Sequence, residues 1–177
     1  LDNGQERWKT ILPGIPSGRI SSSTPCLSDG HIFAVGGNRI FCLDSKDGQL
    51  LWETQLESQG IASSPLVHNG LVYLLAGNLK AFDSQNGKLV WENKSVAGKI
   101  ASPMLWKTNH FEYVVCNASK SVVCVDPKTG STTWQGPGGG SSTPTAAGDI
   151  LLVHGKPEEV GLIAFRNRKG KILEEWR

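Results

Sequence analysis

The sequence predicts an all-β protein, a β-propeller of four-stranded antiparallel blades, with about four blades present in its 177 residues. The first observation is a motif of aspartate, glycine and tryptophan at offsets of 0, 4 and 8 residues. Its tryptophans recur every 39 to 44 residues, at Trp8, Trp52, Trp91, Trp134 and Trp176, which is the length of one four-stranded blade. The second observation is that short apolar runs alternate with Gly, Asn, Pro and Ser, as is typical of short strands and turns.

The motif is complete in three places and weaker near both ends of the chain. The complete copies run from Asp44 to Trp52, from Asp83 to Trp91 and from Asp126 to Trp134. One partial copy runs from Gly4 to Trp8, and the other from Arg166 through Gly170 to Trp176, where the tryptophan comes two residues late. We interpret the recurring residues as a structural signature of the repeat, namely Trp8, Asp44, Gly48, Trp52, Asp83, Gly87, Trp91, Asp126, Gly130 and Trp134.

Each recurring residue has a predicted physical role. The pairs Asp47-Gly48 and Asn86-Gly87 are typical of tight primed turns, because glycine, and less readily Asn or Asp, adopts the positive φ that such turns require. The aspartate is expected to cap the turn rather than to act as a general acid. The tryptophan, on the fourth strand of each blade, is expected to pack between neighbouring sheets with its N–H bonded to a carbonyl.

A second recurring element, serine or threonine followed by proline, marks the start of each blade. It occurs at residues 24–25, 64–65, 102–103 and 143–144. Proline suits the beginning of a strand because its missing amide hydrogen is harmless there. Middle strands are expected at residues 32–35 and 40–43, and again at 71–75 and 79–82. The predicted division is one isolated fourth strand at residues 4–10, followed by blades at about 18–56, 60–95, 99–136 and 140–177.

Composition excludes several other classes of protein. The net charge is +2, from 18 basic and 16 acidic residues spread along the chain, so no footprint for nucleic acid stands out. No apolar run approaches the roughly 20 residues of a membrane span. A helical solenoid is the alternative for a repeat of this length, but no segment sustains the helical period of apolar residues.

The four cysteines are interpreted as small apolar residues rather than as metal ligands. Cys42 and Cys124 share one repeat column with two alanines, so this column is expected to hold a small buried residue. Cys26 and Cys42 are expected two strand spacings apart, nearly 10 Å, which is too far for a disulfide. A cross-strand disulfide between Cys116 and Cys124 stays open at this point. No CxxC pair is present, which argues against zinc.

No catalytic, cofactor-binding or metal-binding residue is predicted. The four histidines, at positions 31, 68, 110 and 154, do not share a repeat column. The glycine-rich segment 136–143 lacks the lysine and the following helix of a phosphate-binding loop, and it is interpreted as a linker between blades. No GxSxG, HExxH or comparable motif is found.

The repeat unit resembles the pyrroloquinoline-quinone-like (PQQ-like) repeat family. The best match runs over residues 61–91, in Ser64-Pro65, in the strand that follows Gly70, in Ala81-Phe82-Asp83 and in Gly87 to Trp91. The resemblance covers essentially the whole chain and implies a propeller. One branch of the family consists of quinoprotein dehydrogenases with a quinone and calcium; another is non-catalytic and includes the outer-membrane protein assembly lipoprotein.

This sequence departs from the dehydrogenase branch. It has no adjacent Cys-Cys pair, and no set of Asn, Glu and Asp can be assigned to calcium. The resemblance therefore implies a non-catalytic propeller that binds or scaffolds a protein partner, without a cofactor. The alternatives are a fragment of a PQQ- and calcium-dependent dehydrogenase, or an accessory propeller of a larger enzyme.

The same resemblance implies an arrangement and a location. Four blades are expected to be part of a seven- or eight-bladed ring, and an open arc would favour self-association. The alternative is a small closed ring in which residues 4–10 complete the last blade. The family implies a periplasmic or otherwise extracytoplasmic location in a bacterium, whereas free cysteines are typical of the cytoplasm.

Overall fold

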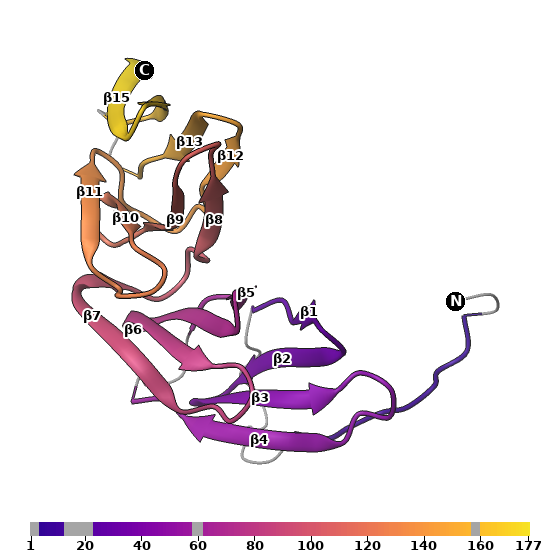
Figure 1. The fold of residues 1–177 in the computed structure, drawn as a ribbon. Coiled ribbons are helices and arrows are strands. Elements are labelled where there is room, and N and C mark those ends of the chain that lie inside the picture. Colours follow the sequence, from indigo (N-terminus) through magenta and orange to yellow (C-terminus); the bar gives the residue numbers. More distant parts are fainter. Residues whose placement is uncertain (1–3, 13–22, 58–61, 157–159) are drawn as a thin grey trace.

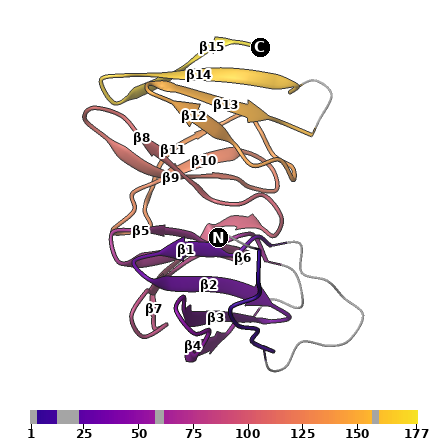
Figure 2. The ribbon, with the colours of Figure 1, turned by 90° about the vertical axis from the view of Figure 1, so that its right-hand side faces the viewer.

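The computed structural model describes residues 4–12, 23–57, 62–156 and 160–177, and within them it shows four antiparallel sheets that follow one another along a curved stack (Figures 1 and 2). Blade 1 contains β1 (Cys26–Ser28), β2 (His31–Gly36), β3 (Arg39–Asp44) and β4 (Leu50–Gln55). Blade 2 contains β5 (Leu66–His68), β6 (Leu71–Asp83) and β7 (Leu89–Gly98). Blade 3 contains β8 (Met104–Lys107), β9 (Glu112–Asn117), β10 (Val122–Val125) and β11 (Thr132–Gly136). Blade 4 contains β12 (Thr145–Ala147), β13 (Ile150–His154), β14 (Leu162–Arg168) and β15 (Lys171–Trp176).

Each sheet is a meander in which consecutive strands pair in chain order. The predicted all-β propeller architecture is therefore confirmed. β1, β5, β8 and β12 each begin directly after the Ser/Thr-Pro pair, as the sequence predicts. These four first strands also contact one another from blade to blade, so they form the inner edge of the curve. The predicted blade starts at residues 18 and 60 lie outside the described residues.

Blade 2 differs from the prediction because its two middle strands form one element. β6 pairs with β5 through its first half and with β7 through its second half. The amide of Ser84 donates to the carbonyl of Gly70 at 2.9 Å, so the two ends of β6 lie side by side. The strand therefore folds back on itself, at Gly77, whose φ of +81° permits the reversal. This hairpin is so short that no separate turn divides the predicted segments 71–75 and 79–82.

The strand expected at residues 4–10 is not assigned as a strand in the structure. Residues 4–12 nevertheless lie against blade 1, where the Trp8 indole donates to the Ser45 carbonyl at 3.2 Å and the Thr10 hydroxyl donates to the Gly48 carbonyl at 2.7 Å. A strand needs a neighbouring backbone ladder, and no described residue supplies the other three strands of that blade. The side chains therefore dock without a sheet behind them.

Blade 4 corrects the interpretation of the last repeat. Lys169 and Gly170 have φ values of +54° and +89°, as a tight primed turn requires. The ladder between β14 and β15 continues up to this turn, to the pair Arg168 and Lys171, whereas the β3–β4 ladder of blade 1 ends at Leu43 and Leu50. Trp176 pairs with Ala164. Trp52 pairs with Cys42 in the same way. Trp176 is thus late in the sequence but in register in the sheet, because the turn is tighter and more residues pair between Trp176 and the turn.

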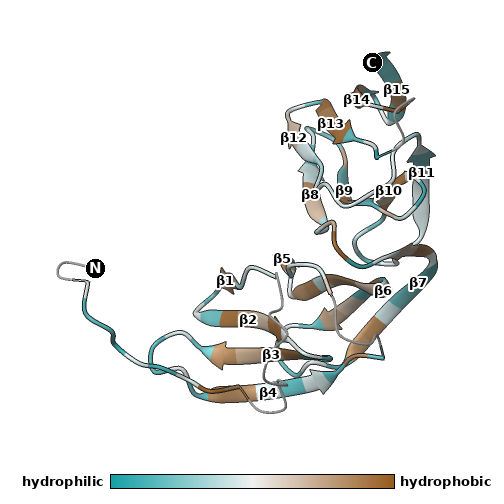
Figure 3. Ribbon diagram, turned by 180° about the vertical axis from the view of Figure 1, so that it is seen from behind, coloured by the Kyte–Doolittle hydropathy of each residue, from teal (hydrophilic) through white to brown (hydrophobic). Residues whose placement is uncertain are grey.

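The hydrophobic core lies between the blades, in three clusters of buried side chains. Hydrophobic residues concentrate on the middle strands, such as β2, β3 and β6 (Figure 3). Strand alternation sends neighbouring residues of one strand into two different clusters. The middle strands of blades 2 and 3, such as β6 and β9, are therefore buried on both of their faces.

The same alternation decides whether Cys116 and Cys124 can form a disulfide, which the sequence left open. Cys116 pairs with Val123, and Cys124 pairs with Val115, so the two cysteines are offset by one residue. Cys116 faces the cluster between blades 2 and 3, and Cys124 faces the cluster between blades 3 and 4. A disulfide between them is excluded, because their side chains lie on opposite faces of the sheet.

Candidate functional site

Most of the recurring signature residues lie at the junctions between neighbouring blades. The Trp52 indole donates to the carbonyl of Ser84 in the next blade at 3.0 Å, and the Thr54 hydroxyl donates to the carbonyl of Gly87 at 2.7 Å. Trp91 donates in the same way to the carbonyl of Pro127 at 3.1 Å. Trp8 does so on blade 1, as described above. The signature therefore builds the scaffold rather than a reactive site.

The glycine of the motif leaves room for the tryptophan of the preceding blade. A Cβ atom added to Gly87 would lie 2.5 Å from Cε3 of Trp52, and one added to Gly48 would lie 2.4 Å from Cε3 of Trp8. Gly130 has the same relation to Trp91. Aspartate and glycine also close the turn itself, because the amide of each glycine donates to the carbonyl of the aspartate four residues earlier.

These turns are not the primed pairs that Asp47-Gly48 and Asn86-Gly87 predict. Only the glycine of each pair has a positive φ. Each turn is longer than a two-residue primed turn, and the aspartate at its start stabilises it by accepting backbone amides. The Asp44 carboxylate accepts the amide of Lys46 at 2.7 Å, and Asp83 and Asp126 accept amides in the same way. The aspartates thus cap the turns as predicted. Primed turns occur instead at Asp29-Gly30 and Asn69-Gly70, where both residues have a positive φ.

Two contributions to the junctions were missed from the sequence. The Ser/Thr-Pro residues form a hydrogen-bonded ladder along the inner edge, in which each amide donates to the hydroxyl of the next blade. The steps are Thr24 to Ser64 at 2.8 Å, Ser64 to Ser102 at 3.1 Å and Ser102 to Thr143 at 3.0 Å. The recurring hydroxyl was visible in the sequence, but only the proline beside it was interpreted.

The second contribution to the junctions that was missed from the sequence is Trp106 on β8, which is 1% exposed. Its indole donates to the carbonyl of Gly148 in blade 4 at 2.9 Å. Trp134 on β11 instead packs edge-on against Phe165, with ring centroids 4.9 Å apart. The junction between blades 3 and 4 thus takes its indole hydrogen bond from the inner strand. Because Trp106 is outside the repeated motif, no feature of the sequence indicated this role.

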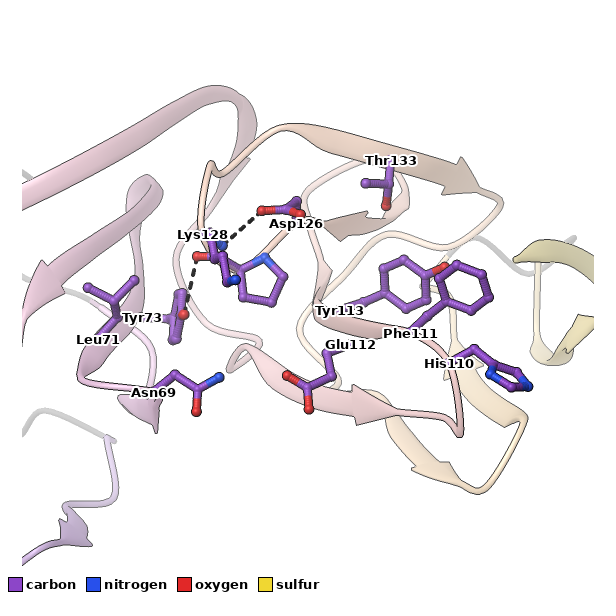
Figure 4. Close-up of a pocket in the computed structure, with 11 residues that line it drawn as sticks. Asn69, Leu71, Tyr73, His110, Phe111, Glu112, Tyr113, Asp126, Lys128 and Thr133 are labelled. Atoms are coloured by element: carbon purple, nitrogen blue, oxygen red, sulfur yellow. Dashed lines mark hydrogen bonds between the residues drawn. The ribbon is translucent and has the colours of Figure 1, made fainter. Parts of the chain in front are cut away.

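A pocket of about 580 Å³ opens between blades 2 and 3 (Figure 4). It lies where the β5–β6, β8–β9 and β10–β11 turns come together. Its lining is more apolar than polar and includes Asn69, Leu71, Tyr73, His110, Phe111, Glu112, Tyr113, Asp126, Pro127, Lys128 and Thr133. We call it the inter-blade pocket.

Aromatic rings form one wall of the inter-blade pocket. Phe111 stacks on Tyr113, with ring centroids 6.1 Å apart and an interplanar angle of 11° (Figure 4). Phe111 remains 37% exposed, whereas Tyr113 is buried. The Tyr73 hydroxyl donates to the carbonyl of Pro127 at 3.2 Å. Burial, reinforced by Asp126, raises the pKa of Tyr73 to about 12, so this phenol stays protonated at neutral pH.

The two carboxylates of the pocket are already engaged. Glu112 accepts hydrogen bonds from Lys107 Nζ at 2.7 Å and from His68 Nε2 at 2.9 Å, and these bonds lower its pKa. Asp126 accepts the backbone amides of Thr129 at 2.8 Å and of Lys128 at 2.9 Å, and its pKa is also lowered, chiefly by the bond from Thr129. The pocket thus presents an apolar wall with fixed charges near its rim.

The residues of this pocket do not suit a quinone with calcium. Both carboxylates are held by protein donors, and within the described ranges no three side chains of His, Cys, Asp or Glu converge as metal ligands. The buried thiols are poor nucleophiles, since burial raises the pKa of Cys42 to about 11 and that of Cys124 to about 12. The arrangement is suited to binding an apolar group.

The Asp126 cap predicts a dependence of stability on pH. Its folded pKa is depressed, so its stabilisation is present above the unfolded value of about 3.9 and is lost as the pH falls through the folded value. We expect Asp126→Asn to cost stability at pH 7 and to cost much less at pH 3. Urea unfolding at both pH values measures this, and an equal cost at the two pH values would contradict the assignment.

Comparison with known proteins places this geometry in a family. A family model described as outer membrane protein assembly factor BamB matches residues 1–176. The chain belongs to this family of PQQ-like repeats. A search of curated proteins finds no match. In the described part of the chain, no helix has the length and hydropathy that a membrane crossing requires.

Solved structures show the same fold at low sequence identity. BamB from Moraxella catarrhalis is 17% identical with a TM-score of 0.69, over 94% of this chain and 52% of that one. Quinohemoprotein alcohol dehydrogenase from Comamonas testosteroni is 17% identical with a TM-score of 0.70, over 89% of this chain and 34% of that one. The designed Ika4 protein is 15% identical with a TM-score of 0.67, over 93% of this chain and 99% of that one. The BamB-family chain thus matches about half or less of the natural proteins, and it corresponds to four blades of a larger propeller.

Proposed function

We propose that this BamB-family chain is a non-catalytic propeller module that binds a partner protein through the inter-blade pocket. The observation that carries the proposal is the half-exposed Phe111 stacked on Tyr113 inside a concave, mainly apolar site. Anchoring pockets in protein interfaces have this character, with a desolvated aromatic centre and a polar rim. A peptide segment that inserts an aromatic or aliphatic side chain fits it.

The electrostatics of the rim define the partner further. Glu112 forms ion pairs with His68 on β5 and Lys107 on β8. Lys128 and His110 also line the pocket, and both are exposed to solvent. The family description, an outer membrane assembly factor, supports a protein partner and an extracytoplasmic location. The dehydrogenase neighbour shares the fold, but the engaged carboxylates do not favour a quinone site here.

A panning experiment tests the proposal. Phage-displayed random peptides are selected on the folded protein, and an enriched peptide is titrated into wild type and variants. We expect enriched sequences to share one aromatic or aliphatic residue. We expect Phe111→Ala to weaken binding by about tenfold or more, as truncation of an interface anchor does. The matched control, Leu27→Ala, removes a side chain that is 69% exposed on β1 and should leave the affinity unchanged.

Two results would overturn the proposal. One is peptide affinity that is insensitive to Phe111→Ala while the variant stays folded. The other is saturable, calcium-dependent binding of pyrroloquinoline quinone in a calorimetric titration, which would favour the dehydrogenase alternative. An unrelated propeller titrated in parallel controls for nonspecific quinone binding.

A further inference from the structure

A second pocket, of about 420 Å³, lies at the opposite end of the sheets from the inter-blade pocket. Successive turns of a meander alternate between the two ends of its sheet. The inter-blade pocket takes its residues from the β5–β6, β8–β9 and β10–β11 turns. The second pocket instead takes them from the β9–β10 and β13–β14 turns, the hairpin of β6 and the connections that precede β8 and β12. Blades 2, 3 and 4 all contribute to it, and we call it the connection pocket.

The polar side chains that line the connection pocket can all donate hydrogen bonds. Two are the ammonium groups of Lys99 and Lys156, and two are the hydroxyls of Ser119 and Ser141. Among the described lining residues there is no aspartate or glutamate. Within the described part of the chain, neither lysine forms an ion pair and neither hydroxyl forms a hydrogen bond. The pocket therefore gathers positive charge and donors that have no described acceptor.

The glycine-rich segment 136–143 forms one wall of the connection pocket. It lacks the lysine of a phosphate-binding loop, but the fold brings lysines to it from two other places. The amide of Lys156 donates to the Gly139 carbonyl at 2.7 Å. A Cβ added to Gly140 would lie 3.0 Å from the Cβ of Lys156, so the β13–β14 turn packs closely on this segment. Lys99 lies in the connection between blades 2 and 3, on the same pocket.

The glycine-rich wall is held in place by Asn117, which is fully buried. Its Oδ1 accepts the amide of Gly139 at 2.7 Å. Its Nδ2 donates to the carbonyls of Ser142 at 3.1 Å and of His154 at 3.0 Å. The amide of Gly140 also donates to a carbonyl of the β9–β10 turn, at 3.1 Å. Because the backbone is already ordered, a ligand that binds here does not have to order it.

We propose that the connection pocket binds a phosphoryl group. At pH 7 such a group carries about −1.5 to −2 charges and three strong acceptor oxygens, which match two ammonium groups and two hydroxyls. A carboxylate has one charge and two oxygens, so it would leave part of this donor set unpaired. Lys99 and Lys156 are exposed, so their attraction for the ligand is screened by salt. This site is separate from the pocket proposed for the partner protein.

Titration of inorganic phosphate and of pyrophosphate into nitrogen-15-labelled protein, followed by NMR, tests the proposal. The titration is done at constant ionic strength and at about pH 8, where the phosphoryl group is dianionic. We expect saturable shifts of the amides of Ser119, Gly140 and Ser141, and much weaker binding of acetate. Lys99→Gln and Lys156→Gln should each weaken phosphate binding by about threefold, and the double variant by about tenfold, as loss of exposed ion pairs does.

The matched control replaces Lys46 and Lys88 with glutamine. Both are exposed in turns at the other end of the sheets, so the double control removes the same charge and should bind phosphate like wild type. Circular dichroism checks that each variant is folded. Equal affinity in wild type and in the Lys99 and Lys156 double variant, or an equal loss in the control, would overturn the proposal. Acetate that binds as tightly as phosphate would overturn the choice of a phosphoryl group.

Discussion

Replacing Trp106 with alanine is expected to lower the free energy of unfolding by about 4 kcal/mol, the usual cost of truncating a buried tryptophan. Trp106 is 1% exposed in the cluster between blades 3 and 4. Its ring lies 5.9 Å from that of Tyr113, and its indole donates to the Gly148 carbonyl. Truncation would create a cavity and leave that carbonyl without its indole partner. Urea denaturation followed by circular dichroism measures the loss.

Two further variants separate packing from hydrogen bonding at this position. Trp106→Phe keeps most of the buried area but loses the N–H, so a smaller cost of about 1 to 2 kcal/mol is expected. Leu27→Ala, at a site that is 69% exposed, should stay within about 0.5 kcal/mol of wild type. A Trp106→Ala protein as stable as Leu27→Ala would show that this junction does not depend on the indole.

The second large effect is expected at Gly87. Gly87→Ala should cost about 3 kcal/mol, because two penalties add. Its φ of +70° is unfavourable for any residue with a Cβ, by about 1 to 2 kcal/mol. The new Cβ would also lie 2.5 Å from the Trp52 ring, and such overpacking costs about 1 to 3 kcal/mol.

Gly70 in the same blade provides the matched control. Its φ of +75° is similar, but a Cβ added there would meet nothing within 4 Å. Gly70→Ala should therefore carry only the backbone penalty, about 1 to 2 kcal/mol. The difference between the two variants isolates the contact between glycine and tryptophan across the junction. Equal costs would mean that Trp52 moves aside freely and that the junction is not tightly packed.

Local sequence features predicted much of this fold because they act through local physics. The Ser/Thr-Pro pair and the Asp-to-Gly turn constrain the backbone within a few residues, so the starts of β1, β5, β8 and β12 and the capping role of Asp44 follow from the sequence. The tryptophan period predicted the blades and their outer strands. The primed-turn prediction at residues 47–48 and 86–87 was wrong because a side-chain cap, and not the dipeptide alone, selects the turn type.

Properties that depend on pairing between distant segments could not be predicted in the same way. Cys116 and Cys124 were left as a possible pair because a shift of one residue in register moves a side chain to the opposite face. Trp176 was interpreted as two residues late because the sequence does not show that its blade has a shorter turn and a ladder that continues up to that turn. The inter-blade pocket gathers Tyr73 and Phe111, which lie in different blades, so no single repeat copy contains it.

The sequence by itself determined the class of fold, the number of blades and the repeated tryptophans that pack between blades, because each of these repeats with a nearly fixed period. The tertiary structure decided which surfaces remain available for binding. The occupation of the Ser45 carbonyl by Trp8 and the enclosure of the pocket beside Phe111 both depend on what lies across a junction. The segment that lies across a junction is determined by the packing of whole blades, which no local sequence pattern encodes.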